Sequence, residues 1–482
     1  MFRTIFPTLR YSAGSFLLPV ILLFALIARL ANLNYNSPFN DEAIYSVVGK
    51  LALYQGDWWS YNAKSWMGGH PYIYPTLSAA ATIGQSMVGP RLLNVVFGVL
   101  SIEMVYVLTK NLAVWQKLPY PNLAALISAL IIAFSSVSLY ISRLATYDTP
   151  SYYFLLLSLV FLVQALPANS GKNYFLAAIL LLLSFFTKII VVIYIPFIIL
   201  FSFLAAKKSK KTFNLYLRYY LAPIILGFAG YFLVNISAIL TFTSNQATRA
   251  PESSARILSY FFQLSAYHWI FWSISSLGFF IVKKTKLWAL LTALSFLVLL
   301  FHLGTNRLAT LDKHLFFTFC FLSVAIGIGI SSLLASLKSQ ILRYSAISLF
   351  IYLGFFFFKN EFAQKSIFER QWLNASPMLA KLAEVVQNGD KVLTEGGATT
   401  IWSLYPVNSP FNITTFDWFE YQNLTGDYAY LQAIKDGYFD YIELDGQAEW
   451  RKSLTDQIFT VINQNYQKIY TDNNFSIYER NY

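Results

Sequence analysis

The chain has 482 residues, of which 56% are hydrophobic and 12% are charged, and its mean hydropathy is +0.51. Soluble globular proteins carry about 25% charged residues, so this composition excludes an ordinary soluble domain. The net charge of +12 is divided unevenly: residues 1–358 hold 25 Lys and Arg against seven acids, whereas residues 359–482 hold ten against 16. We therefore predict a membrane domain over 1–358 and a separate polar domain over 359–482.

Apolar segments recur along the first domain, and a membrane span needs roughly 20 apolar residues. The candidates are 12–33, 90–109, 120–140, 150–167, 174–187, 189–205, 219–240, 266–282, 287–304, 314–337 and 342–358. The fifth is short and the eighth is polar. The first has no small-residue cleavage site, so we interpret it as a retained span. The sequence predicts a polytopic α-helical membrane protein with about 11 transmembrane helices.

Basic residues cluster in alternate loops, and such clusters face the cytoplasm in membrane proteins. If the N-terminus is cytoplasmic, the clusters at 110–117, 207–211, 283–286 and 338–343 all face the cytoplasm. The positive charge thus encodes topology, and we expect no nucleic-acid partner. We expect a multi-pass protein of the plasma (inner) membrane with an extracytoplasmic C-terminal domain. Six of the seven acids then lie at the outer face, which predicts a functional site there.

The first outer loop, residues 34–89, begins with Asp41 and Glu42 just after the first span. Apolar residues at helical spacing over 43–54 predict an amphipathic helix along the membrane surface, and 76–88 is a second candidate. This arrangement would hold Asp41 at the membrane–water boundary, at the depth of a lipid phosphate.

Several motifs in the first 205 residues occur together in one known superfamily. They are Asp41-Glu42-Ala43 with Tyr45, Gly56-Asp57-Trp58, His70-Pro71 with Tyr74-Pro75-Thr76-Leu77, Arg91-Leu92, Arg143-Leu144-Ala145 with Asp148, and Lys188. In order and spacing the chain resembles the polyprenyl-phosphate-sugar-dependent glycosyltransferases of the GT-C fold. Within these it is similar to the protein O-mannosyltransferase and lipid A aminoarabinose transferase superfamily.

The chain also departs from that pattern at two places. Leu311-Asp312-Lys313-His314-Leu315 replaces an Arg-Tyr-Leu-like stretch, and Gly69-His70-Pro71-Tyr72 replaces a Lys-Pro-Pro motif. The first change keeps a cation, and the second suggests a different sugar or acceptor.

The resemblance implies transfer of a sugar from a polyprenyl-phosphate carrier to an acceptor hydroxyl on a protein, lipid or glycan. It implies that Asp41 is the general base, although Asp41 would also cap a helix. Glu42 either positions the acceptor or is solvated, and Asp148 is either a second active-site carboxylate or a helix cap. The alternative that Asp41 and Glu42 bind a divalent cation stays open, but no metal-spaced cluster accompanies them.

Transfer leaves a phosphate behind, so cations are needed beside the carboxylates. The candidates for binding the donor phosphate are Lys188, Arg143, Lys64, His70, Arg307, Lys313 and His314. Candidates for the sugar or acceptor are Tyr45, Trp58 and Tyr74, whose rings can stack on a sugar, although aromatic residues also gather at membrane interfaces.

In the polar tail, Ser376-Pro377 predicts the start of a helix, and strand-like segments at 391–395, 412–416, 441–445 and two closing segments alternate with helices near 427–437 and 453–464. This order predicts a small α/β layer that begins parallel and ends in a hairpin. Competing interpretations of the whole chain are a lipid-linked sugar transporter or flippase, and a surface-polysaccharide polymerase or ligase. The absence of an obvious repeat disfavours transport.

Overall fold

The computed structural model describes residues 14–61, 63, 67, 73–247, 251–417, 419–445 and 452–481. The chain divides into two compact units. The helical unit comprises Met1–Leu33, Asn62–Tyr74 and Arg91–Phe368, and the mixed unit comprises Asn34–Tyr61, Pro75–Pro90 and Glu369–Tyr482. Most of the loop 34–89, which we had grouped with the membrane domain, thus folds with the C-terminal segment.

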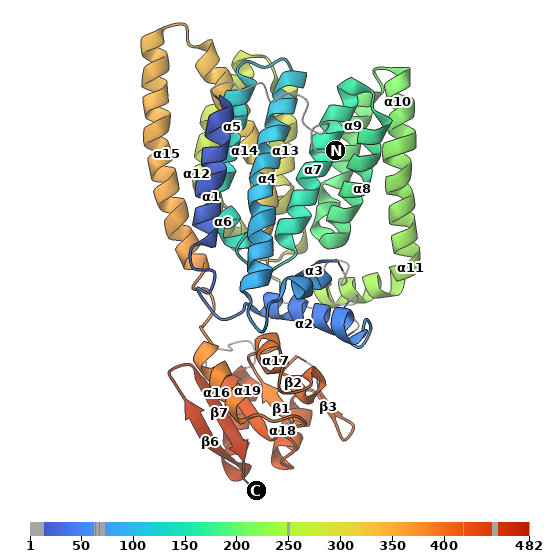
Figure 1. Ribbon diagram of the computed structural model, residues 1–482, viewed down its shortest axis with the longest axis vertical. Coiled ribbons are helices and arrows are strands. Elements are labelled where there is room, and N and C mark those ends of the chain that lie inside the picture. The colour runs from blue at the N-terminus through green and yellow to red at the C-terminus, as the bar shows by residue number, and fades with distance from the viewer. Residues whose placement is uncertain are drawn as a thin grey trace. The chain divides into compact units, whose positions relative to one another are not determined.

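The helical unit is a bundle of long apolar helices whose axes run roughly side by side (Figure 1). Its helices are α1 (Gly14–Leu30), α4 (Val88–Trp115), α5 (Pro121–Phe134), α6 (Ser136–Ile141), α7 (Asp148–Ala168), α8 (Gly171–Thr187), α9 (Ile195–Ala206), α10 (Lys210–Tyr216), α11 (Ala222–Ala247), α12 (Ser254–Ile281), α13 (Thr285–Thr305), α14 (Leu311–Ser336) and α15 (Gln340–Phe368). Each apolar segment predicted from the sequence overlaps one or more of these helices over its described residues.

Six stretches of the described chain are long and apolar enough to cross a membrane: α4, α7, α10–α11, α13, α14 and α15. Four shorter apolar helices, α1, α5, α8 and α9, accompany them. The chain is therefore a multi-pass membrane protein. The number of 11 spans and the cytoplasmic N-terminus stay predictions. Helix α12, which contains the polar eighth candidate, is not among the six stretches that are long and apolar enough to cross a membrane.

Helix α14 is the centre of the bundle and is buried along almost its whole length. Glycines allow its neighbours to approach closely. A Cβ atom on Gly329 would lie 2.2 Å from the Ser275 carbonyl oxygen of α12, and one on Gly327 would lie 2.1 Å from Ser128 Oγ of α5. Small residues serve this purpose in membranes, where van der Waals contact drives helix association.

A five-stranded sheet with the order β2-β1-β5-β7-β6 organises the mixed unit. Its strands are β1 (Val392–Thr394), β2 (Ile413–Thr415), β5 (Tyr441–Asp445), β6 (Tyr466–Thr471) and β7 (Phe475–Arg480). β1 pairs in parallel with β2 and β5, whereas β7 pairs antiparallel with β5 and β6. The predicted α/β layer, parallel at first and closed by a hairpin, is confirmed.

Short helices complete the mixed unit, together with a small hairpin of β3 (Glu420–Tyr421) and β4 (Leu424–Thr425). The helices are α2 (Asn40–Gln55), α3 (Tyr74–Ala81, mostly in this unit), α16 (Ser376–Val385), α17 (Ala398–Leu404), α18 (Asp427–Lys435) and α19 (Lys452–Asn465). The two amphipathic helices predicted in the loop 34–89 correspond to α2 and α3, although α3 ends at Ala81 rather than at 88. Helix α17 has no counterpart among the predicted elements.

Two carboxyl groups are buried where the parallel strands β1 and β5 end. Glu443 is fully buried, and its Oε2 accepts a hydrogen bond from the Gly396 amide at 2.8 Å. Glu395 accepts one from the Asp445 amide at 2.6 Å. Burial raises the pKa of each to about 7, because the charged form loses its hydration.

These raised pKa values predict that the mixed unit is more stable in mild acid. Between the ordinary pKa of 4.5 and the folded value of about 7, the folded state binds more protons than the unfolded state. Stability is then greatest at the acidic end of this window and is lost as the pH rises through about 7.

The substitution Glu443→Gln keeps an acceptor for the Gly396 amide but cannot ionise. We expect it to raise the thermal unfolding midpoint of the purified protein at about pH 8 and to leave it nearly unchanged at about pH 5. If the substitution changed the unfolding midpoint equally at both pH values, the raised pKa of Glu443 would be contradicted.

Candidate functional site

A buried ion pair joins α7 to the end of α8. Asp148 is the first residue of α7, and Lys188 directly follows α8. The Lys188 ammonium contacts Asp148 Oδ1, and the two residues are only 4% and 1% exposed. The ammonium also lies 5.1 Å from the centroid of the Tyr147 ring, where a cation–π interaction is favourable. The structure thus brings two predicted site residues into direct contact.

The turn before Asp148 is held by buried polar groups from other helices. Asn94 of α4 donates hydrogen bonds to the carbonyl oxygens of Leu144 and of Thr146, the latter at 2.7 Å. Arg143 donates to carbonyl oxygens at the end of α1, those of Arg29 at 3.1 Å and Asn32 at 2.8 Å. A helix end leaves such carbonyls without intrahelical partners, so Arg143 caps α1. Its predicted contact with a donor phosphate stays a prediction.

The first turn of α14 brings further basic side chains to this ion pair. Lys313 and His314 are 6% and 7% exposed, and the charge of Lys313 acts on Asp148 together with that of Lys188. Both lysines also act on His314. We call Asp148, Lys188, Lys313 and His314 the cationic cluster. Asp312, the residue before Lys313, is a second carboxylate in the field of both lysines, so two lysines and a histidine meet two aspartates here.

A second histidine fixes the orientation of His314. His302 Nε2 lies 2.9 Å from His314 Nδ1, and His302 Nδ1 lies 2.7 Å from the carbonyl oxygen of Arg307. Because a carbonyl oxygen only accepts, His302 Nδ1 must donate, and in the neutral ring Nε2 then accepts from His314 Nδ1. This assignment leaves His314 Nε2 as the site where a proton can be gained.

The other predicted carboxylates lie at the start of α2 in the mixed unit. Asp41 is the second residue of this helix and is partly exposed, so Phe39 and not Asp41 occupies the cap position. Glu42 is fully buried, and its Oε2 accepts a hydrogen bond from the Phe39 amide at 2.8 Å. That bond satisfies an amide in the first turn, which is a structural task for Glu42.

The remaining predicted residues differ in how far they are accessible. Trp58 is 37% exposed, whereas Tyr45 and Tyr74 are 4% and 1% exposed, so Trp58 is the better placed of the three to stack on a sugar. Arg307 is partly buried and contributes its carbonyl to His302. Lys64 and His70 lie outside the described residues.

Sequence reasoning did not single out His302, Asn94 or Arg29. Arg29 is fully buried and donates hydrogen bonds to Ser142 Oγ and Ser138 Oγ, both at 2.8 Å. A polar residue inside an apolar helix was the available signal, because such residues are costly in a membrane and need partners.

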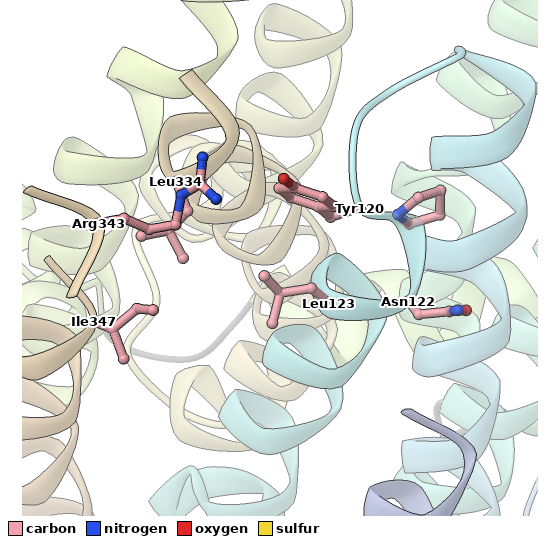
Figure 2. A pocket seen from close by; sticks show the side chains of 7 residues that line it. Tyr120, Asn122, Leu123, Leu334, Arg343 and Ile347 are labelled. Atoms are coloured by element: carbon pink, nitrogen blue, oxygen red, sulfur yellow. The ribbon is translucent and has the colours of Figure 1, made fainter. Parts of the chain in front are cut away.

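Within the part of the chain that the structure describes, no group of three or more His, Cys, Asp or Glu side chains is arranged to hold a metal ion. A cavity of about 480 Å³ lies between the start of α5, the end of α14 and the start of α15 (Figure 2). It is lined by Tyr120, Pro121, Asn122, Leu123, Leu334, Arg343 and Ile347, none of which is a predicted site residue.

Comparison with known proteins identifies the fold. Residues 70–232 match the family model described as dolichyl-phosphate-mannose-protein mannosyltransferase. Sequence comparison with curated proteins gives no match. The structure of ArnT from Cupriavidus metallidurans bound to undecaprenyl phosphate is similar with a TM-score of 0.64 and 10% identity, over 97% of this chain and 98% of ArnT.

Archaeal oligosaccharyltransferases give a second set of similar structures. The Archaeoglobus fulgidus enzyme in its apo form has a TM-score of 0.59 and 12% identity, over 97% of this chain and 74% of its own. AglB from the same organism, in complex with an inhibitory peptide and a dolichol-phosphate, has a TM-score of 0.57 and 13% identity, over 94% of this chain and 73% of AglB. The chain has the GT-C fold, and the predicted resemblance and fold class are confirmed.

The buried ion pair predicts a stability effect that depends on both partners. Asp148→Asn leaves the buried Lys188 ammonium without its carboxylate, and we expect the free energy of unfolding to fall by about 3 kcal/mol. The double variant Asp148→Asn/Lys188→Met removes both charges and should recover most of this loss. Thermal unfolding of the detergent-purified protein measures both effects. If Asp148→Asn and the double variant were equally destabilised, an energetic coupling between Asp148 and Lys188 would be contradicted.

Proposed function

We propose that this protein is an integral-membrane glycosyltransferase that moves a hexosyl or pentosyl group from a polyprenyl-phosphate carrier to an acceptor hydroxyl. The observation that carries this proposal is the cationic cluster: two buried lysines and a histidine gathered around Asp148, with Asp312 nearby, in a GT-C fold. Burying so much charge in an apolar bundle is costly, so the cluster is better explained by an anionic ligand than by stability alone.

The similar proteins support a lipid phosphate as that anion. The family model matched by residues 70–232 names a dolichyl-phosphate-mannose donor, and the ArnT structure contains undecaprenyl phosphate. Lys188, Lys313 and His314 would bind the phosphate of such a donor, with Arg143, Arg307, Lys64 and His70 as further candidates. His302 would hold the His314 ring in place.

The proposed reaction needs one base and a stabilised leaving group. Asp41 would accept the proton of the acceptor hydroxyl as its oxygen attacks the anomeric carbon of the sugar. The bond from that carbon to the phosphate oxygen breaks, and its electron pair leaves on the polyprenyl phosphate. The cations compensate the charge that develops there. A general acid is unnecessary because the phosphate departs as an anion.

Three finer assignments belong to the same proposal. Transfer would take place on the outer side of the membrane, because the basic clusters of the short loops favour the other side as cytoplasmic. The acceptor is a protein, lipid or glycan hydroxyl, and Trp58 would stack on a sugar ring. A divalent cation at Asp41 and Glu42 is not required by this chemistry.

Asp41→Asn tests the proposal. The protein is reconstituted with radiolabelled polyprenyl-phosphate mannose, glucose or aminoarabinose, and membranes from cells lacking the chain supply the acceptor. We expect wild-type protein to release polyprenyl phosphate from one of these donors and Asp41→Asn to release at least about a hundredfold less.

Asp57→Asn is the matched control, because it removes a partly exposed acid of the same loop whose carboxylate accepts hydrogen bonds from the Trp59 and Ser60 amides. Normal turnover by Asp41→Asn would contradict its role as the base.

A further inference from the structure

The start of α2 is held on two sides by the C-terminal segment, and all of these contacts lie within the mixed unit. On one side, the first two residues of α17 contact Pro38 and Asn40, the residue before Asp41. Asn40 Oδ1 accepts a hydrogen bond from the Ala398 amide at 3.0 Å, and Thr399 Oγ1 donates to the carbonyl oxygen of Pro38 at 3.2 Å. The first turn of α2 is thus tied to a loop more than 350 positions later in the chain.

The geometry of this loop depends on glycine. Gly397 has φ +59° and ψ −134°, which side chains disfavour, and a Cβ atom on it would lie 3.1 Å from Asn40 Oδ1. The preceding Gly396 amide is held by the buried Glu443. The loop leaves the carboxyl end of β1 beside β5, which is where parallel sheets of this kind place functional loops.

On the other side, the segment 372–375 contacts Ser37, which is 3% exposed. Ser37 Oγ accepts a hydrogen bond from the Ala375 amide at 3.1 Å and donates to the Leu373 carbonyl oxygen at 3.3 Å. The Trp372 indole donates to the Ser37 carbonyl oxygen at 3.0 Å, and its ring packs edge-on against Phe39 at 5.1 Å. The approach to α2 is therefore fixed by buried, mutually satisfied polar groups.

We propose that these contacts form a clamp that positions Asp41 for proton transfer. The clamp consists of Ser37, which is hydrogen-bonded to the segment 372–375, and Asn40, which is hydrogen-bonded to Ala398. Ser37 and Asn40 are positioning residues, because they act through Asp41. This inference rests on the proposed function, in which Asp41 is the base. It also gives the C-terminal segment a task, since that segment supplies the other half of each contact.

The physical reason for such a clamp is the sensitivity of proton transfer to geometry. Asp41 lies in the first turn of its helix, and the ends of a helix are the parts most prone to fray. A base misplaced by about 1 Å can cost up to a hundredfold in rate. If the contacts of Ser37 and Asn40 only stabilised the fold, losing them should have the same effect on activity as losing a contact at the other end of α2. There, Gln55 donates to the Tyr405 hydroxyl at 2.8 Å.

The test compares Ser37→Ala, Asn40→Ala and their double variant with Gln55→Ala as the matched control. Asn40→Asp keeps the acceptor for the Ala398 amide and is the rescue variant. We expect the double variant to lower kcat roughly ten- to a hundredfold while KM for the donor lipid stays within about twofold. Gln55→Ala and Asn40→Asp should keep kcat near the wild-type value.

Hydrogen–deuterium exchange of the full-length protein provides a readout that does not depend on activity. The double variant should exchange faster over residues 38–46, and Gln55→Ala should not. Unchanged exchange, or wild-type kcat in the double variant, would overturn the clamp. If wild-type protein releases no polyprenyl phosphate from any donor, the proposed function fails, and faster exchange would still establish that Ser37 and Asn40 order the start of α2.

Discussion

Ionic groups inside an apolar helical bundle must find partners, and the structure of the helical unit depends on how Asp148 and Lys188 meet this constraint. An unpaired charge at such a position would cost several kcal/mol. The ion pair therefore requires the start of α7 and the end of α8 to lie together, and the first turn of α14 brings Lys313 and His314 to the same place. Asn94 and Arg143 then fix the turn that leads into Asp148.

The number of ionisable side chains in this cluster distinguishes it from a single structural ion pair. Two lysines and a histidine meet Asp148 here, and a partly buried second carboxylate, Asp312, lies in the field of the lysines. His302 fixes the orientation of the His314 ring beside the lysines. An anion of variable charge, such as a phosphate, is the ligand that suits such a set.

Much of the fold could be predicted from the sequence, because it follows from local patterns. Apolar length predicted the helices of the bundle, and the alternation of strands and helices predicted the parallel-then-hairpin sheet. Asp148 and Lys188 were also named from the family resemblance, and Lys313 and His314 were named as further phosphate candidates where the chain departs from the family pattern. The pairing of Lys188 with Asp148 was not predictable, since only the packing of α7 against α8 brings the two residues together.

The features that sequence reasoning missed depend on contacts between distant parts of the chain. His302 lies within an apolar helix, and only its distance to His314 reveals a role. The ties of Asn40 to Ala398 and of Ser37 to Ala375 join the loop 34–89 to the C-terminal segment, so no local pattern signals them. Helix α17 was missed for a related reason: it is a seven-residue helix, too short for a clear periodic signal.

The central claim is that the cationic cluster binds the phosphate of a polyprenyl carrier. A cryo-electron microscopy structure of the protein with undecaprenyl phosphate tests this claim most directly. We expect density for the phosphate within hydrogen-bonding distance of Lys188, Lys313 and His314. A phosphate bound away from all three side chains, with Lys188 still paired to Asp148 as in the free protein, would contradict the claim.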